Sequence, residues 1–175
     1  KNQACPAKHL EGLIHFVSKK GMNIEGLGEK IVEEFRELGL ITDQASVFKL
    51  TKQDIEGLEG FGEKSAENII ASIDGARTVP FHRALYSLGI RHVGEQTAKD
   101  IAKPFETFDR LQNAKSDELA HVEGVGEKVA DALSRCLVGA TAGCESHRLP
   151  MPLKIDADQR IGLVIAGKIL GLDAD

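Results

Sequence analysis

One short pattern occurs four times along this chain at a nearly constant spacing. In three copies an apolar residue and a glutamate precede Gly-x-Gly-Glu-Lys, where x is apolar; these copies begin at Ile24, Leu58 and Val122. The remaining copy begins at Ile90 and has His92 in place of the first glycine. The period of 32 to 34 residues indicates a chain built from repeated supersecondary units. The second glycines of the four copies are Gly28, Gly62, Gly94 and Gly126.

The segments after each copy have the periodicity of amphipathic helices. Apolar residues recur there at intervals of three and four, as in the set Ile31, Val32, Phe35 and Leu38. A small residue stands four positions after three of the second glycines, where it allows close helix packing: Ala66, Ala98 and Ala130. Shorter apolar segments precede the second and fourth copies, with Thr51 and Ser116 as expected N-caps. We therefore expect an all-α fold of four tandem helix-hairpin-helix motifs forming two paired units, followed by an irregular C-terminal tail. A tetratricopeptide array has a similar period but no Gly-x-Gly turn.

The turns also predict a site for anions. Glycine adopts positive φ at little steric cost, and the helix after the turn begins with unpaired N–H groups that favour a phosphate. Lys30, Lys64 and Lys128 lie in the first helical turn and add charge, and Arg91 is the best single candidate for a side-chain contact. The glutamates after the second glycines suit a helix N-terminus by the dipole alone, and they oppose a phosphate placed very close. The candidate DNA-binding residues are Gly26, Gly28, Lys30, Gly60, Gly62, Lys64, Arg91, His92, Gly94, Gly124, Gly126 and Lys128.

Composition limits the class of protein. The chain is 42% hydrophobic and 28% charged, which is typical of globular domains. A net charge of −5 excludes a wholly basic nucleic-acid-binding surface, but local phosphate binding needs no net positive charge. Three cysteines in 175 residues do not form a disulfide framework. The longest apolar stretch, 161–172, is too short to span a membrane, so we expect a cytoplasmic protein without a membrane partner. We also expect a monomer.

Three segments of this chain resemble segments of the bacterial NAD-dependent DNA ligases, and they occur in the same order along the chain. The string Ala84–Glu95 resembles the third hairpin of that family, which also carries histidine for glycine there. Met22–Lys30 resembles the first hairpin, and Asn2–Ala7 resembles the end of the four-cysteine zinc module. The resemblance implies a zinc-module remnant at 1–7, a helix-hairpin-helix DNA-binding domain at 8–137, and a linker and unassigned tail at 138–175. This tail is expected to depart from the family.

The resemblance also implies a function for the parent protein. The family seals nicks in double-stranded DNA during replication and repair, using NAD and Mg²⁺ bound outside this chain. Its helix-hairpin-helix domain grips the duplex across the minor groove, mostly through phosphates, so the implied partner is nicked DNA in the bacterial, nucleoid-associated cytoplasm. The adenylated Lys-x-Asp-Gly motif is absent: in the nearest string Ser72 replaces lysine, and Gly75 is expected to end a helix. The fragment should therefore be inactive alone. Of the four zinc-binding cysteines that the resemblance implies for the parent, only Cys5 is expected here, so the zinc site is incomplete.

Two other interpretations remain open from the residues. One is a helix-hairpin-helix module of another DNA repair or recombination protein, which shares the turns. The other is a helical protein-interaction scaffold that has lost DNA binding, which the acidic net charge allows. His9 and His15 are expected at the surface or the boundary of the first helix, while His82, Arg83, Arg91 and His92 give the third repeat local positive charge.

Overall fold

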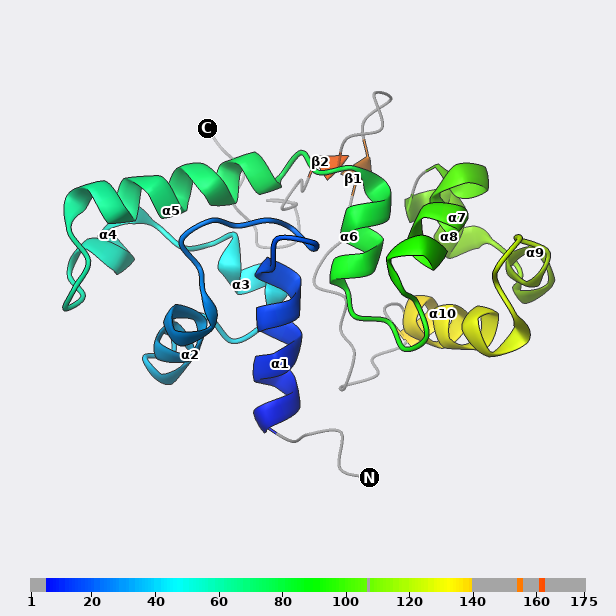
Figure 1. Ribbon diagram of the computed structural model, residues 1–175, viewed down its shortest axis with the longest axis horizontal. Helices are drawn as coiled ribbons and strands as arrows, with labels where there is room; N and C mark the ends of the chain where they lie inside the picture. The colour runs from blue at the N-terminus through cyan, green and yellow to red at the C-terminus, as the bar shows by residue number, and fades with distance from the viewer. Residues whose placement is uncertain (1–5, 107, 140–153, 156–160, 163–175) are drawn as a thin grey trace, which may run out of the picture.

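The computed structural model describes residues 6–106, 108–139, 154–155 and 161–162. These residues form short helices arranged along an elongated molecule (Figure 1). The helices are α1 (Pro6–Val17), α2 (Glu29–Glu37), α3 (Gln44–Val47), α4 (Lys52–Glu56), α5 (Glu63–Ala76), α6 (Phe81–Ser87), α7 (Glu95–Phe105), α8 (Phe108–Asn113), α9 (Ser116–Ala120) and α10 (Glu127–Gly139). The predicted all-α class is confirmed for the described residues of 6–139.

The two halves of the molecule repeat the same order of elements. In each half, a helix–hairpin–helix segment is joined by a short helix to a second one: α1 to α5 in the first half and α6 to α10 in the second. We call residues 6–76 the first pair and residues 81–139 the second pair. The second hairpin lies at one end of the molecule, between α4 and α5, and the fourth lies at the other end, between α9 and α10 (Figure 1).

Hairpins pack against one another within each pair. In the first pair, a Cβ added at Gly26 would lie 2.7 Å from Cγ1 of Ile69 on α5. In return, Phe61 of the second hairpin packs on Phe35 of α2, with ring centroids 5.5 Å apart. In the second pair, the fourth hairpin approaches α7, because a Cβ at Gly124 would lie 3.4 Å from Oδ2 of Asp100. This packing agrees with the predicted arrangement in two paired units.

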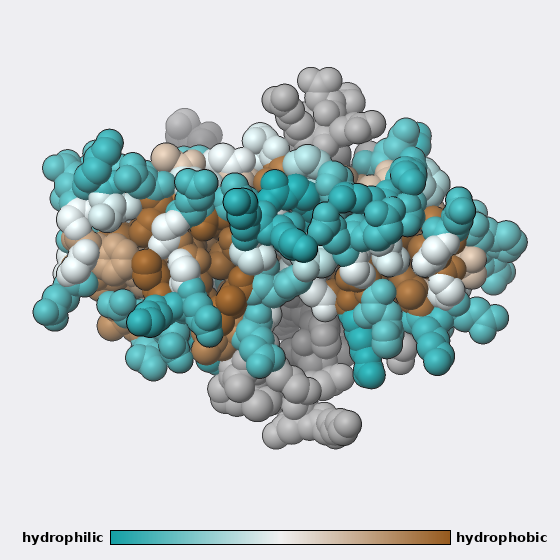
Figure 2. Space-filling model, in the orientation of Figure 1, coloured by the Kyte–Doolittle hydropathy of each residue, from teal (hydrophilic) through white to brown (hydrophobic). Residues whose placement is uncertain are grey.

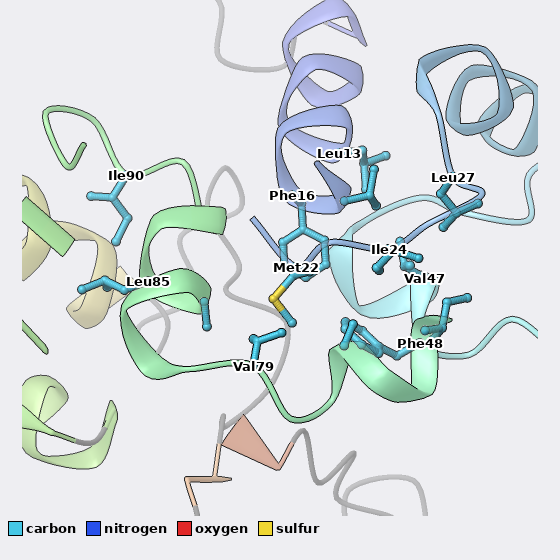
Figure 3. Packing of buried hydrophobic residues seen from close by; sticks show 14 of the residues in the cluster. Leu13, Phe16, Met22, Ile24, Leu27, Val47, Phe48, Val79, Leu85 and Ile90 are labelled. Atoms are coloured by element: carbon cyan, nitrogen blue, oxygen red, sulfur yellow. The ribbon is translucent and has the colours of Figure 1, made fainter. Parts of the chain in front are cut away.

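The core runs through both pairs without interruption. The small residues Ala66, Ala98 and Ala130 are buried, as their place after the hairpins predicts. At the junction of the pairs, Met22 lies between Phe16 of α1 and Val79 of the connection from α5 to α6 (Figure 3). Polar side chains cover much of the surface, and apolar ones show between them in each half (Figure 2). Apolar burial therefore holds the pairs together as well as each pair internally.

Four details differ from the sequence-based expectations. Thr51 is the N-cap of α4, as predicted, but Ser116 is the first residue of α9 and its N-cap is Lys115. Leu38 is 54% exposed, because α2 ends before it and its side chain leaves the apolar face. Gly75 does not end α5, which continues to Ala76. The connecting helices α3 and α8 were not expected, since each has too few residues to show a period.

The C-terminal tail, expected to be irregular, contains a small sheet among its described residues. Strand β1 (Lys154–Ile155) pairs with β2 (Ile161–Gly162) in antiparallel register, with Lys154 opposite Gly162. Backbone pairing at two residues per strand leaves no alternation of side chains for a sequence pattern to reveal. The rest of residues 140–175 lies outside the described part of the chain.

Candidate nucleic-acid interface

The four hairpins have the same turn geometry. We call the positions of the two glycines in the Gly-x-Gly pattern the first and second key positions. In each hairpin, the N–H of the residue between them donates to the carbonyl three residues earlier, as from Phe61 to Leu58 at 3.1 Å. The equivalent distances in the other hairpins are 3.4, 3.0 and 2.9 Å. The first key position has positive φ throughout: Gly26 90°, Gly60 85°, His92 68° and Gly124 82°. A turn with positive φ at its third residue follows the type II pattern, which glycine adopts most readily.

The second glycines differ from the first in what their backbone requires. Gly28, Gly62 and Gly94 are the N-caps of α2, α5 and α7, with φ between −72° and −86° and extended ψ. Any residue can adopt these angles. A Cβ built at any of these three positions, or at Gly126, meets no atom within 4 Å. Neither strain nor internal packing therefore accounts for glycine at this position.

An N-cap glycine leaves the start of its helix open. It carries no side-chain oxygen, and no side-chain cap is present at the starts of α2, α5 or α7. The first N–H groups of these helices therefore point outward without a capping partner. Because the helix dipole also favours negative charge at this end, each start offers the donors that a phosphate binds.

Charged side chains surround these helix starts. Lys30, Lys64 and Lys128 are exposed, and Nζ of Lys64 lies 3.8 Å from Glu67. The Glu63 carboxylate at the start of α5 accepts a hydrogen bond from Lys52 at 2.8 Å. That bond and the lysine charge hold the pKa of Glu63 below its usual value of 4.5. The glutamate that opens α5 is thus paired with a lysine.

The third hairpin has a different charge environment. Its turn carries the exposed Arg91 where the other three carry Glu25, Glu59 and Glu123. Glu95 at the start of α7 bonds Lys99 at 2.8 Å and lies 3.5 Å from Lys20 of the first pair. The bond from Lys99, with the charges of both lysines, lowers the pKa of Glu95. The third hairpin is therefore the most electropositive of the four turns.

The first two hairpins border one groove of about 840 Å³. Gly26 and Gly60 both line it, so the structure brings these predicted residues together. The first turn is fixed there by the N–H of Glu25, which donates to Oγ of Ser72 at 2.6 Å. Ser72 is the residue that stands in place of the lysine of the Lys-x-Asp-Gly motif. In this fold its side chain thus supports the first hairpin.

No group of three or more potential metal ligands occurs among the residues that the structure describes. Cys5, the candidate zinc ligand of the parent, lies outside them. Within the same residues, no helix has the length and apolarity needed to cross a lipid bilayer.

Comparison with known proteins agrees with the geometry of the turns. A family model described as a SAM-like helix-hairpin-helix tandem matches residues 22–74, and one described as a helix-hairpin-helix motif matches residues 83–138. The chain is 48% identical to a DNA ligase of Phocaeicola vulgatus over 74% of its length, and 46% identical to one of Anoxybacillus flavithermus over 75%. The chain belongs with the helix-hairpin-helix domains of DNA ligases. It spans 20% of the length of each of these two relatives.

A further relative also matches part of the tail at 138–175. The DNA ligase of Bacteroides fragilis is 42% identical over 94% of the chain, which amounts to 26% of that relative. The unmatched 6% is shorter than the segment 138–175, so the match extends into the tail. The matches to the two relatives above cover only 74 to 75% of the chain, and the boundaries at 1–7, 8–137 and 138–175 remain predictions.

Two residues with a structural role at the junction of the pairs were not identified from the sequence. Arg83 was expected to add surface charge, but it bonds backbone carbonyls of the first pair. His15 was expected at the surface or boundary, and its Nε2 lies 2.9 Å from the carbonyl of Tyr86. Their partners are 62 to 71 residues away in sequence, so no local pattern signals these contacts.

Proposed function

We propose that this domain binds duplex DNA without reading its sequence, through backbone phosphates at the starts of α2, α5, α7 and α10. The observation that carries the proposal is the second glycine of the hairpins, which faces open space in all four and leaves the starts of α2, α5 and α7 without a side-chain cap. A phosphate oxygen approaches such N–H groups only where no side chain intervenes. Phosphate contacts position a protein on DNA and carry no sequence information.

In the parent protein, the domain helps an NAD-dependent ligase to hold a nicked duplex across the minor groove. The ligase names of the relatives and the resemblance of Ala84–Glu95 support this part of the proposal. NAD, Mg²⁺ and zinc belong to segments of the parent outside the described residues. The domain acts as a monomer in the bacterial cytoplasm, and without the adenylated lysine it does not seal nicks alone.

Binding to fluorescent duplexes, nicked and intact, at two salt concentrations tests the proposal. We expect affinity that is independent of sequence and falls with salt, with a modest slope because few side-chain cations take part. Gly62→Val and Gly126→Val should each lower affinity at least ten-fold, because the added side chain stands where the phosphate approaches. Equal binding by these variants and the parent would show that the hairpins do not contact DNA.

A second substitution separates DNA contact from folding. Gly62→Ser keeps the backbone angles and supplies a capping oxygen, so it should stabilise α5 by a few tenths of a kcal/mol (roughly 0.3). The same oxygen occupies the donors that the phosphate needs, so DNA affinity should fall while the melting temperature does not. A variant that loses both together would indicate misfolding instead.

A further inference from the structure

Arg83 of α6 joins the two pairs by hydrogen bonds to the backbone of the first pair. Its Nε donates to the carbonyl of Gly21 at 3.1 Å, and its Nη2 donates to the carbonyl of Lys19. Both carbonyls lie in the turn between α1 and the first hairpin. The planar guanidinium holds two acceptors at fixed angles, so these bonds restrain orientation as well as distance.

Other contacts at this junction leave little freedom for the turn that Arg83 binds. A Cβ at Gly21 would lie 2.6 Å from the carbonyl oxygen of Phe16 and 3.2 Å from Cβ of Ser87 in the second pair. The rings of His15 and Tyr86 meet edge to face, with centroids 4.7 Å apart. The apolar contact of Met22 with Val79 joins the first pair to the connection between the pairs, but such a contact is non-directional and does not select one orientation (Figure 3).

We propose that Arg83 is a positioning residue that fixes the orientation of the two pairs, so that their hairpins bind one duplex together. This inference rests on the proposed function. When two binding units belong to one rigid body, binding by the first unit already orients the second. The second unit then contacts its phosphates without a further loss of rotational freedom. Once the orientation is free, the second pair contributes less to affinity although every hairpin is intact.

The chain offers a matched control in Arg77. Its Nη2 donates to the carbonyl of Phe48 at 2.9 Å, and its Nε lies 3.0 Å from Asp74. Arg77 thus makes a similar pair of bonds, but both partners belong to the first pair. Loss of Arg77 removes comparable hydrogen bonds and leaves every bond to the second pair in place.

The first experiment measures the distance between spin labels on the two pairs. Labels are placed at the exposed Gln53 and Asp117 after the three native cysteines are changed to serine. We expect a narrow distance distribution in the parent and in Arg77→Gln, a broader one in Arg83→Gln, and partial recovery in Arg83→Lys. A distribution in Arg83→Gln as narrow as in the parent would overturn the proposal.

The second experiment compares duplexes of one and two helical turns, roughly 10 and 20 base pairs. Lengthening the duplex should raise the affinity of the parent and Arg77→Gln about ten-fold more than that of Arg83→Gln. An equal gain in all three proteins would overturn the role of Arg83 in joint binding. If the parent binds neither duplex, the proposed function fails, and the label distances alone decide whether Arg83 fixes the orientation.

Discussion

Helices α4 and α5 are neighbours in sequence but begin in opposite ways. At the start of α4, the Thr51 N–H bonds the Asp54 carboxylate at 2.8 Å, and the Thr51 side chain accepts from the Asp54 N–H. The start of α5 follows a turn with positive φ at Gly60, and its N-cap, Gly62, makes no side-chain cap. The helix α3 resembles α4, since Asp43 caps it.

The difference between the capped start of α4 and the uncapped start of α5 indicates two different roles for a helix start. A capped start satisfies its own donors and contributes to stability. An uncapped start gives up that contribution and keeps donors available for an external anion. The described starts of α2, α5 and α7, which follow a hairpin, have glycine as the N-cap. Helices α3 and α4 have a capping side chain instead, and α6, whose N-cap is Pro80, has none. The following predictions test this division of roles.

The largest expected effect concerns the first hairpin. Gly26→Ala combines backbone strain at φ 90° with a methyl group 2.7 Å from Ile69, so it should cost about 3 kcal/mol of stability. Gly60→Ala has the same strain but no atom within 4 Å, and it should cost about 1 kcal/mol. Urea unfolding of both variants measures the difference. Equal losses would mean that the turn, and not its packing on α5, dominates.

A smaller effect is expected at the capped start of α4. Thr51→Ala removes the cap and should cost about 1 kcal/mol of stability. DNA affinity should stay within two-fold of the parent (about 0.4 kcal/mol), because this helix does not follow a hairpin. Chemical unfolding and fluorescence anisotropy on the same preparation give both values. A marked loss of affinity with little loss of stability would place α4 in the DNA contact.

The third hairpin should tolerate a change toward the other three. His92 holds a positive φ of 68°, which strains a residue with a Cβ. His92→Gly removes that strain but adds freedom to the unfolded chain, so we expect a net gain of about 0.5 kcal/mol. Thermal unfolding at constant pH checks the sign. Destabilisation would show that the imidazole makes a stabilising contact that outweighs its backbone strain.

The smallest expected effect is on the glutamate that opens α5. Because Lys52 lowers the pKa of Glu63, the ion pair stabilises the fold above pH 4.5, and this stabilisation is lost as pH falls through the lowered pKa. In Lys52→Met the pKa of Glu63 should return toward 4.5, whereas Lys99→Met should leave Glu95 partly paired with Lys20. NMR titration of the two carboxylates distinguishes these cases. An unchanged pKa in Lys52→Met would rule out the pair in solution.

Much of the fold was predictable because its information is local. A period of 32 to 34 residues, helical spacing of apolar residues and glycine pairs located the hairpins and the long helices after them. Local rules were less reliable at element ends, as at Ser116 and Gly75, where a shift of one residue costs little energy.

The sequence by itself therefore determined the four turns and the helices that follow them, and it supplied the candidate phosphate-binding residues. Only the tertiary structure decided how the turns are arranged: which hairpin packs on which helix, which glutamates are neutralised, and how Arg83 joins the pairs. The physical reason is distance along the chain. Backbone preference and periodicity act over a few residues, whereas these contacts join residues far apart in sequence and form only once both pairs have folded.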